Sequence, residues 1–256
     1  MKIKTANTLL CGITFLSIAI MFFIASIPQD PHYHLFSDQR TLCGINHFWN
    51  VMSNLPFLLV GIYGLWRLKK IKIESIQWAY GVFCVGVILV CFGSGYYHFN
   101  PTNHTLVWDR LPMTIAFMAL FSLLLHERVL VNPKTLTLIP LLIIGAASVF
   151  YWDWTETQGQ GDLRFYALVQ FLPIMLIPLI LWLYPRRYFR GGYLLWAFVF
   201  YFAAKLLEHF DAIIYQMLGQ MSGHSLKHMS AAIAVLFIIN AIPVHTLADP
   251  IKNADH

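Results

Sequence analysis

Two pairs of residues have the spacing that places side chains one above the other on a helix. Ser94 and His98 are four residues apart, and His224 and His228 have the same spacing. Residues at this spacing share one helix face, with Cβ atoms about 5–6 Å apart, so two histidines can bind one metal ion, as they do in HExxH zinc enzymes. The histidine pair therefore predicts two metal ligands, although the glutamate of the HExxH motif is missing here.

A third ligand and a catalytic base have to come from another part of the chain. His98 and Asp109 are the available candidates. Three histidines leave a fourth position open for water, which is the ligand count of a catalytic zinc site and not of a structural one. A single histidine at a helix end usually contacts only water or lipid head groups, so the prediction depends on all of these residues occurring together.

The segments that carry these residues are long and apolar. Of the 256 residues, 58% are hydrophobic and 11% are charged, which is more apolar than an ordinary soluble domain. A bilayer core of roughly 30 Å requires about 20 mostly apolar helical residues. Eight segments meet this requirement, near residues 7–27, 48–66, 76–97, 107–125, 135–152, 165–184, 192–217 and 225–245. The sequence predicts an all-α, polytopic integral membrane protein, with a single membrane domain over residues 1–256 and no soluble domain.

The basic residues indicate how these helices are oriented. If the N-terminus is inside, 12 of the 17 basic residues fall on the inner side, as the positive-inside rule expects. They are Lys2, Lys4, Arg67, Lys69, Lys70, Lys72, Arg128, Lys134, Arg186, Arg187, Arg190 and Lys252. Both termini are then cytoplasmic, as in a bacterial inner membrane, and the predicted metal site lies toward the outer side. The net charge of +5 is spread over short connections, so it does not indicate nucleic-acid binding.

Around the predicted site the chain resembles the alkaline ceramidase family, seven-helix membrane amidases grouped with the progestin and adipoQ receptors and the haemolysin III proteins. The resemblance covers about residues 38–245. Four blocks carry it, in order FWNVMSNLPF (48–57), GSGYYH (93–98), DRLPM (109–113) and GHSLKH (223–228). The Asn-x-x-Ser-Asn pattern of the first block points to the ceramidase branch of this superfamily.

The resemblance implies a role for each residue of the predicted site. His98, His224 and His228 correspond to zinc ligands, Asp109 to the base that acts on the metal-bound water, and Ser94 to a hydroxyl that hydrogen-bonds the reacting carbonyl. Zinc lowers the pKa of its water to about 7 and polarises the amide oxygen, while a carboxylate accepts the proton and delivers it to the leaving amine. The expected reaction is hydrolysis of the N-acyl bond of ceramide or a similar N-acyl lipid, which releases a fatty acid and a sphingoid-type amine.

Two features depart from the family pattern. Animal members build a calcium site from acidic residues before the first core helix, whereas Asp38 is the lone acid of the shorter loop here and His47 precedes the first block. Calcium dependence is therefore not expected. Residues 1–30 also have no counterpart in the seven-helix core and add an eighth helix. This segment lacks a small-x-small cleavage site, so we expect an uncleaved helix and not a signal peptide.

Several other polar residues have both a structural and a functional interpretation. In the seventh segment, Lys205 and Glu208 can form a salt bridge, while the same region, with His209 and Asp211, can instead line a substrate cavity or support the metal site. The first interpretation is favoured.

Two further polar groups are interpreted structurally. Asn50, Ser53 and Asn54 are interpreted as interhelical hydrogen-bonding residues, with support of the metal site as the alternative. Asp30, His32 and His34 resemble a loose metal-binding tract, but a solvated loop is the favoured interpretation of residues 30–34.

Three alternative functions stay open from the sequence. The first is another zinc lipid hydrolase of the superfamily, for example one that cleaves acyl esters. The second is a lipid receptor that keeps the metal site without turnover. The third is an ion transporter that uses Lys205, Glu208 and Asp211. Acyl-chain preference, oligomeric state and metal identity are not predicted.

Overall fold

The computed structural model describes residues 3–130 and 136–244, and these residues form helices and loops without a β-strand. The helices are α1 (Ile3–Met21), η1 (Pro31–His34), α2 (Phe48–Met52), α3 (Leu55–Leu68), α4 (Glu74–Phe99), α5 (Asn103–Arg128), α6 (Leu138–Thr157), α7 (Arg164–Leu183), α8 (Gly191–His209), α9 (Asp211–Leu218) and α10 (Gly223–Ala241). Lys2, Lys134 and Lys252, which the topology prediction counts, lie outside the described residues, as do the ends of the segments predicted at 135–152 and 225–245.

Seven spans in the described residues are long and apolar enough to cross a bilayer, and α1 is one of them. The α2 and α3 helices together form one of these spans, Phe48–Leu68. The α8 helix has a similar length of 19 residues but is not one of these spans, and its last turns carry Lys205, Glu208 and His209. It packs along α10. The predicted all-α polytopic fold is confirmed, with α8 as the eighth long helix.

Two predicted segments are interrupted. The segment predicted at 48–66 breaks between α2 and α3, next to Pro56, which has no backbone N–H to donate within a helix. The continuous helix predicted at 192–217 was wrong, because α8 ends at His209 and α9 is a separate short helix. The carboxylate of Asp211, at the start of α9, accepts hydrogen bonds from the backbone N–H groups of Ser37 and His224. These contacts fix α9 against other segments at the point where α8 stops.

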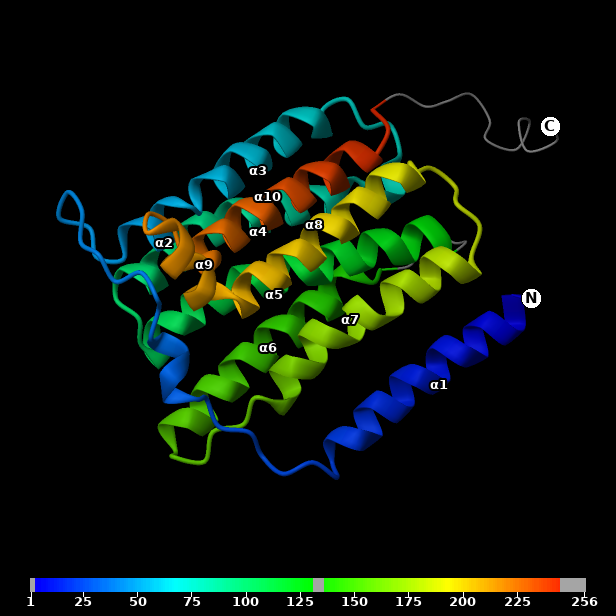
Figure 1. Cartoon of the computed structure of the whole chain (residues 1–256). Coiled ribbons are helices and arrows are strands. Elements are labelled where there is room, and N and C mark those ends of the chain that lie inside the picture. The colour runs from blue at the N-terminus through cyan, green and yellow to red at the C-terminus, as the bar shows by residue number, and fades with distance from the viewer. Residues whose placement is uncertain (1–2, 131–135, 245–256) are drawn as a thin grey trace.

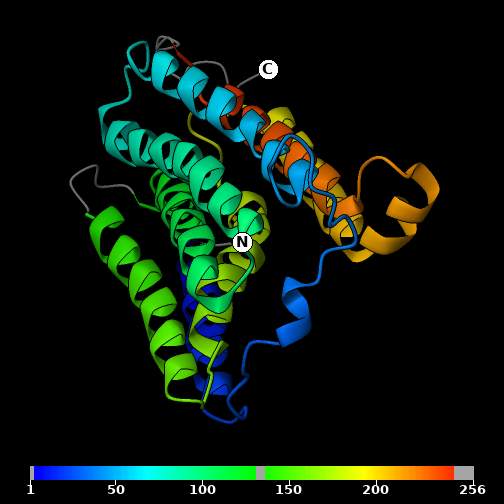
Figure 2. The same cartoon turned by 90° about the vertical axis from the view of Figure 1, so that its left-hand side faces the viewer.

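The helices form a bundle in which α5 packs against α4, α6 and α7, and α10 packs against α8 and α3 (Figure 1). The α1 helix lies at the edge of this bundle and packs against α7. Its Asn7 accepts a 2.5 Å hydrogen bond from the hydroxyl of Tyr184. Figure 2 shows that the segment between α1 and α2 crosses one end of the bundle. This crossing segment covers the end at which α4 finishes and α10 begins.

The opposite end of α5 is fixed by a buried carboxylate. Glu127 is fully buried, and its oxygens accept hydrogen bonds of 2.9–3.0 Å from the backbone N–H groups of Arg187, Tyr188 and Phe189. These three residues belong to the connection between α7 and α8. Backbone donors of a buried connection need such partners, because an unpaired buried polar group is costly. Glu127 therefore ties α5 to the α7–α8 connection.

Candidate metal centre

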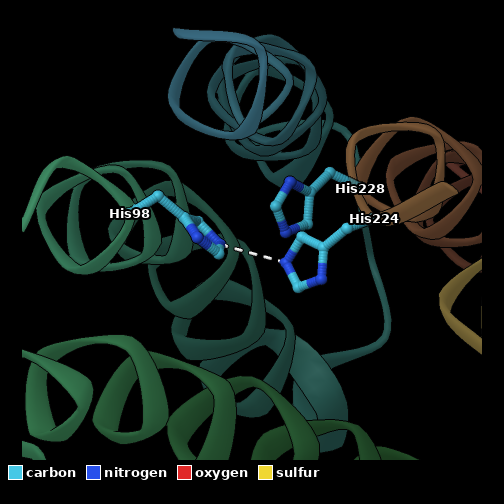
Figure 3. Close-up of side chains that lie close together, drawn as sticks. All are labelled: His98, His224 and His228. Carbon is cyan, nitrogen blue, oxygen red and sulfur yellow. Dashed lines mark hydrogen bonds between the residues drawn. The ribbon is translucent and has the colours of Figure 1, made fainter. Parts of the chain in front are cut away.

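Three histidine side chains converge on one point from two helices (Figure 3). His98 comes from the last turn of α4, whereas His224 and His228 come from the first two turns of α10. Each offers a ring nitrogen, and these nitrogens lie within 4.8 Å of one another. The Nε2 atoms of His98 and His224 are 3.3 Å apart. All three side chains are buried.

The geometry of this histidine cluster fits a metal ion. Zinc–nitrogen bonds of about 2.0–2.1 Å in a tetrahedral site place two ligand nitrogens roughly 3.3 Å apart, which matches the separation of the His98 and His224 Nε2 atoms. Within the described residues, no other group of three histidine, cysteine or acidic side chains has such spacing. Three nitrogen ligands would leave one position for water, as in a catalytic site.

The first turn of α10 is held in place by its neighbours. The Ser222 hydroxyl caps the helix. The Asp211 carboxylate accepts a 2.6 Å hydrogen bond from the backbone N–H of His224. Gly223 lies so close to α8 that a Cβ atom there would be 2.1 Å from the carbonyl oxygen of Leu207. Both His224 and His228 are thus positioned by contacts with α8 and α9.

Ser53, which directly follows α2, orients the second ring of the pair. The Ser53 hydroxyl lies 2.8 Å from Nδ1 of His228, which leaves Nε2 of that ring directed at the other histidines. Asn50 accepts a 2.7 Å hydrogen bond from the Ser225 hydroxyl and so links α2 to α10, as predicted. Asn54 instead donates to the Asn50 carbonyl within its own segment. Ser53 therefore supports the site directly, which was the less favoured interpretation.

Phe36 covers the histidine cluster from the crossing segment. Its ring centroid lies 4.7 Å from that of His98 and 4.8 Å from that of His224. Phe36 is buried although it lies in a loop. Phe36 does not stand out in the sequence, because it is one of 20 phenylalanines and has no helical pattern around it. Its ring shields one side of the cluster from water.

Asp109 and Ser94 lie beside the cluster, on α5 and α4. Gly93 allows these helices to approach, because a Cβ atom there would be 1.9 Å from the carbonyl oxygen of Trp108. Asp109 and Ser94 are both buried, and both line the same cavity as His228. The structure thus brings together all five residues of the predicted site, while the role of each stays a prediction.

A cavity of about 900 Å³ extends from this site into the bundle. Its wall includes Asp109 near the start of α5 and Arg128 at the end of the same helix. Between these two positions the wall is mainly apolar and comes from α4, α5, α7, α8 and α10. The site therefore lies at a polar end of a long apolar cavity.

Three charged side chains of α8 and α10 form a network in the cavity wall. One oxygen of Glu208 lies 2.6 Å from Nζ of Lys227, and the other pairs with Lys205. A salt bridge and a cavity wall were the alternatives for this region. The three side chains form salt bridges and also line the cavity. His209 is exposed and lies outside this network, whereas Asp211 supports α10 as described above.

The loop acid that was considered for calcium is engaged by a neighbouring arginine. Asp38 accepts hydrogen bonds of 2.8 Å from Nε and Nη2 of Arg40. Burial alone would raise the pKa of Asp38, but the hydrogen bonds from Arg40 outweigh burial and hold the pKa below its usual range. Arg40 also donates a 3.2 Å hydrogen bond to the carbonyl of Gly219, after α9. The pair therefore joins the crossing segment to the connection before α10.

The predicted solvated loop at residues 30–34 is solvated only in part. Asp30 and His32 form an exposed pair. His34 instead contacts the Tyr97 hydroxyl at 3.0 Å and Asn103 at 2.9 Å. Its side chain fixes the crossing segment to α4 and α5.

Comparison with known proteins gives one match. A sequence model of the ceramidase family matches residues 43–255. The four sequence blocks on which the resemblance was based all lie within this match, so the resemblance is confirmed. Neither the curated proteins nor the solved structures contain a significant match.

Proposed function

This chain belongs to the ceramidase family, hydrolases that act on amide bonds, and we propose that it is a zinc-dependent amidase that cleaves the N-acyl bond of ceramide or a similar N-acyl lipid within the membrane. The products would be a fatty acid and a sphingoid-type amine. The observation that carries this proposal is the buried cluster of His98, His224 and His228 at the polar end of a long apolar cavity.

The cavity supports a lipid substrate. Its volume of about 900 Å³ is near the upper end of the roughly 300–1,000 Å³ typical of small-molecule sites. Its apolar wall would hold hydrocarbon chains, because burying apolar surface is favourable, while the polar end would hold the amide. A substrate with long chains on one side of a polar group matches this division.

The cavity also has a route to the bilayer. The α7 and α8 helices make almost no contact with each other, although they are consecutive. Phe171 and Trp182 of α7 and Leu195 and Phe198 of α8 line the cavity, and all four side chains are exposed. We propose that the lipid enters between these two helices.

Each polar residue of the site would have a defined task. A zinc ion held by the three histidines would lower the pKa of water and polarise the amide carbonyl. Asp109 would accept the proton of the attacking water and then deliver it to the leaving amine nitrogen. The Ser94 hydroxyl would donate a hydrogen bond to the carbonyl oxygen as negative charge develops there. Ser53 would keep the His228 ring in its orientation.

The distribution of basic residues supports a location for this reaction. We propose a bacterial inner membrane with both termini cytoplasmic and the histidine cluster toward the outer side, because the inner connections hold most of the lysines and arginines. Accessibility of single cysteines, introduced on either side, to a membrane-impermeant reagent would test this orientation.

The central test compares the wild type with the double variant His224→Ala/His228→Ala. Both are purified in detergent, bound zinc is measured by elemental analysis, and hydrolysis of a ceramide with a fluorescent acyl chain is followed by chromatography. We expect about one zinc per chain and turnover, with both lost in the variant. His104→Ala is the matched control, because His104 is an exposed histidine of α5 outside the cluster.

Each result has a distinct meaning. Zinc without turnover over a panel of lipid amides and esters would favour a receptor over an enzyme, and turnover of esters alone would favour another lipid hydrolase. A wild type that binds no zinc would contradict the proposal.

A further inference from the structure

Arg110 is a charged residue of the cavity wall to which the proposed reaction gives no role. It follows Asp109 in α5, lines the same cavity and is only 5% exposed. Its Nη2 donates a 2.6 Å hydrogen bond to the side chain of Gln29. Its Nη1 is buried and has no hydrogen-bond partner among the described residues. A buried guanidinium N–H without an acceptor is unusual, because such a group is normally paired.

Aromatic rings, and no carboxylate, hold this guanidinium in place. Its central carbon lies 4.0 Å from the ring centroid of Trp152, 4.7 Å from that of Tyr166 and 5.9 Å from that of Tyr33. In the described part of the chain, Arg110 takes part in none of the ion pairs within 4.0 Å. The rings attract the cation and fix its direction, but they do not replace a counter-charge.

The other charged groups at this end of the cavity do not balance Arg110. The carboxylate of Glu208 is already shared by Lys205 and Lys227. Together with Asp109 and Arg110, these side chains give three cations and two carboxylates in the cavity wall. A divalent metal ion on the histidines would add further positive charge. A ligand with a negative charge would therefore be favoured at this end.

We propose that Arg110 binds an acidic group on the amine side of the substrate, so that the preferred substrates are N-acyl lipids whose head group carries a carboxylate, sulfonate or phosphate. This inference rests on the proposed amidase function, since it names the substrate class of the same site. The acyl chain occupies the apolar part of the cavity, which places the head group at the polar end beside Arg110. The unpaired Nη1 donor suits an oxyanion, and the aromatic rings hold the guanidinium in one orientation.

The test compares two amides with the same acyl chain, N-acyl taurine with an anionic head and N-acyl ethanolamine with a neutral one. For the zinc-loaded wild type in detergent, we expect kcat/KM to be at least tenfold higher for the N-acyl taurine. In Arg110→Gln the ratio of kcat/KM for N-acyl taurine to kcat/KM for N-acyl ethanolamine falls about tenfold. Arg110→Lys, which keeps the charge, recovers part of this ratio. The ratio within one variant does not depend on how much of that variant is folded.

The matched control is Arg190→Gln. Arg190 is exposed and lies outside the cavity wall, so the Arg190→Gln variant should keep the wild-type ratio of kcat/KM for the two amides. Inhibition by the free fatty acid is measured in parallel. An Arg110→Gln variant that loses product inhibition but keeps the head-group preference would assign Arg110 to the carboxylate of the product and would overturn the proposal.

Other outcomes separate this proposal from the amidase proposal. Equal turnover of the two amides by the wild type, or an equal loss for both in Arg110→Gln, would overturn the head-group inference and leave the amidase intact. If neither amide is hydrolysed, the amidase proposal fails for these lipids. The head-group inference is then tested by how much each lipid stabilises the protein against thermal unfolding. Greater stabilisation by N-acyl taurine, lost in Arg110→Gln, would support an acidic-head site, whereas equal stabilisation by both lipids would refute it.

Discussion

Glu127 near one end of α5 and Asp109 and Arg110 near the other are all buried charged side chains, but their hydrogen-bond partners differ. At one end, three consecutive backbone N–H groups of the α7–α8 connection saturate the carboxylate of Glu127. At the other end, Asp109 lines the cavity and Arg110 keeps a donor without a partner among the described residues. Burial is similar, since all three side chains are less than a tenth exposed. What differs is whether the protein itself satisfies the charge.

This difference separates a structural charge from a functional one. A carboxylate that is fully satisfied by backbone donors has no capacity left for a ligand, and its removal leaves those donors unpaired. A charged group that faces a cavity with unsatisfied capacity can bind or react. Intramembrane charges are functional candidates by default, and we expect hydrogen-bond saturation to distinguish structural charges from functional ones.

The largest effect is expected from Asp109→Asn. Asparagine has nearly the same shape but cannot accept the proton, so we expect turnover to fall about 10²–10⁴-fold, the usual contribution of a general base. Zinc content and thermal stability should stay close to wild type, because the ligands are unchanged. Turnover, elemental analysis and melting of one preparation check this. A variant that unfolds but keeps its turnover per folded molecule would place Asp109 in the same class as Glu127.

Replacement of Glu127 should have the reverse effect to Asp109→Asn: stability falls, while turnover per folded molecule is retained. Glu127→Ala leaves three backbone donors unpaired, and we expect a loss of about 3–5 kcal/mol in stability, as for other broken buried charge networks. Glu127→Gln keeps one acceptor oxygen and should lose less. Thermal unfolding in detergent measures both, and turnover per folded molecule should be retained. Loss of turnover in a Glu127→Gln protein that melts like the wild type would break the comparison.

The Ser53 hydroxyl gives a smaller, site-specific effect. Ser53→Ala removes the contact with His228 Nδ1, and we expect zinc affinity to fall about 10–100-fold, as for other groups that orient metal ligands. Ser148→Ala is the control, because the Ser148 hydroxyl is buried but donates to a carbonyl of its own helix. Zinc titration with a competing chelator measures the affinities. Equal affinity of the Ser53→Ala protein and the wild type would show that the histidine rings are oriented by packing alone.

The sequence was sufficient to predict the long helices and the His224–His228 pair, because both depend on local patterns. Apolar segments of bilayer length predict the spans, and the four-residue spacing places His224 beside His228. The end of α8 at His209 was missed, because the contacts of Asp211 with Ser37 and His224 join residues far apart in the sequence. Helical periodicity contains no information on such contacts.

The role of the crossing segment was missed for a related reason. Phe36 covers the histidines and Gln29 binds Arg110, yet both lie in a segment without periodic pattern. The position of such a loop is set by the surfaces that it meets, and these exist only after the helices have packed. The sequence therefore predicted the residues that line the candidate site more completely than the residues that enclose it.

The smallest effect is expected from two acids of the crossing segment. They also differ in how the protein pairs them, but the expected change in stability is smaller. Asp38 is buried and paired with Arg40, whereas Asp30 is exposed beside His32. The hydrogen bonds from Arg40 hold the pKa of Asp38 below its ordinary value of 3.8. A lowered pKa in the folded state stabilises the protein above the unfolded pKa, and this contribution is lost as the pH falls through the folded pKa.

The melting temperatures of the wild type and Asp38→Asn should therefore differ at pH 6 and converge as the pH falls below about 4. The difference should correspond to about 1 kcal/mol or less, since a third of the Arg40 side chain is exposed and solvent screens the pair. Asp30→Asn serves as the control and should melt like the wild type throughout. A constant difference between the wild type and Asp38→Asn at every pH would show that Asp38 acts through neutral hydrogen bonds and not through its charge.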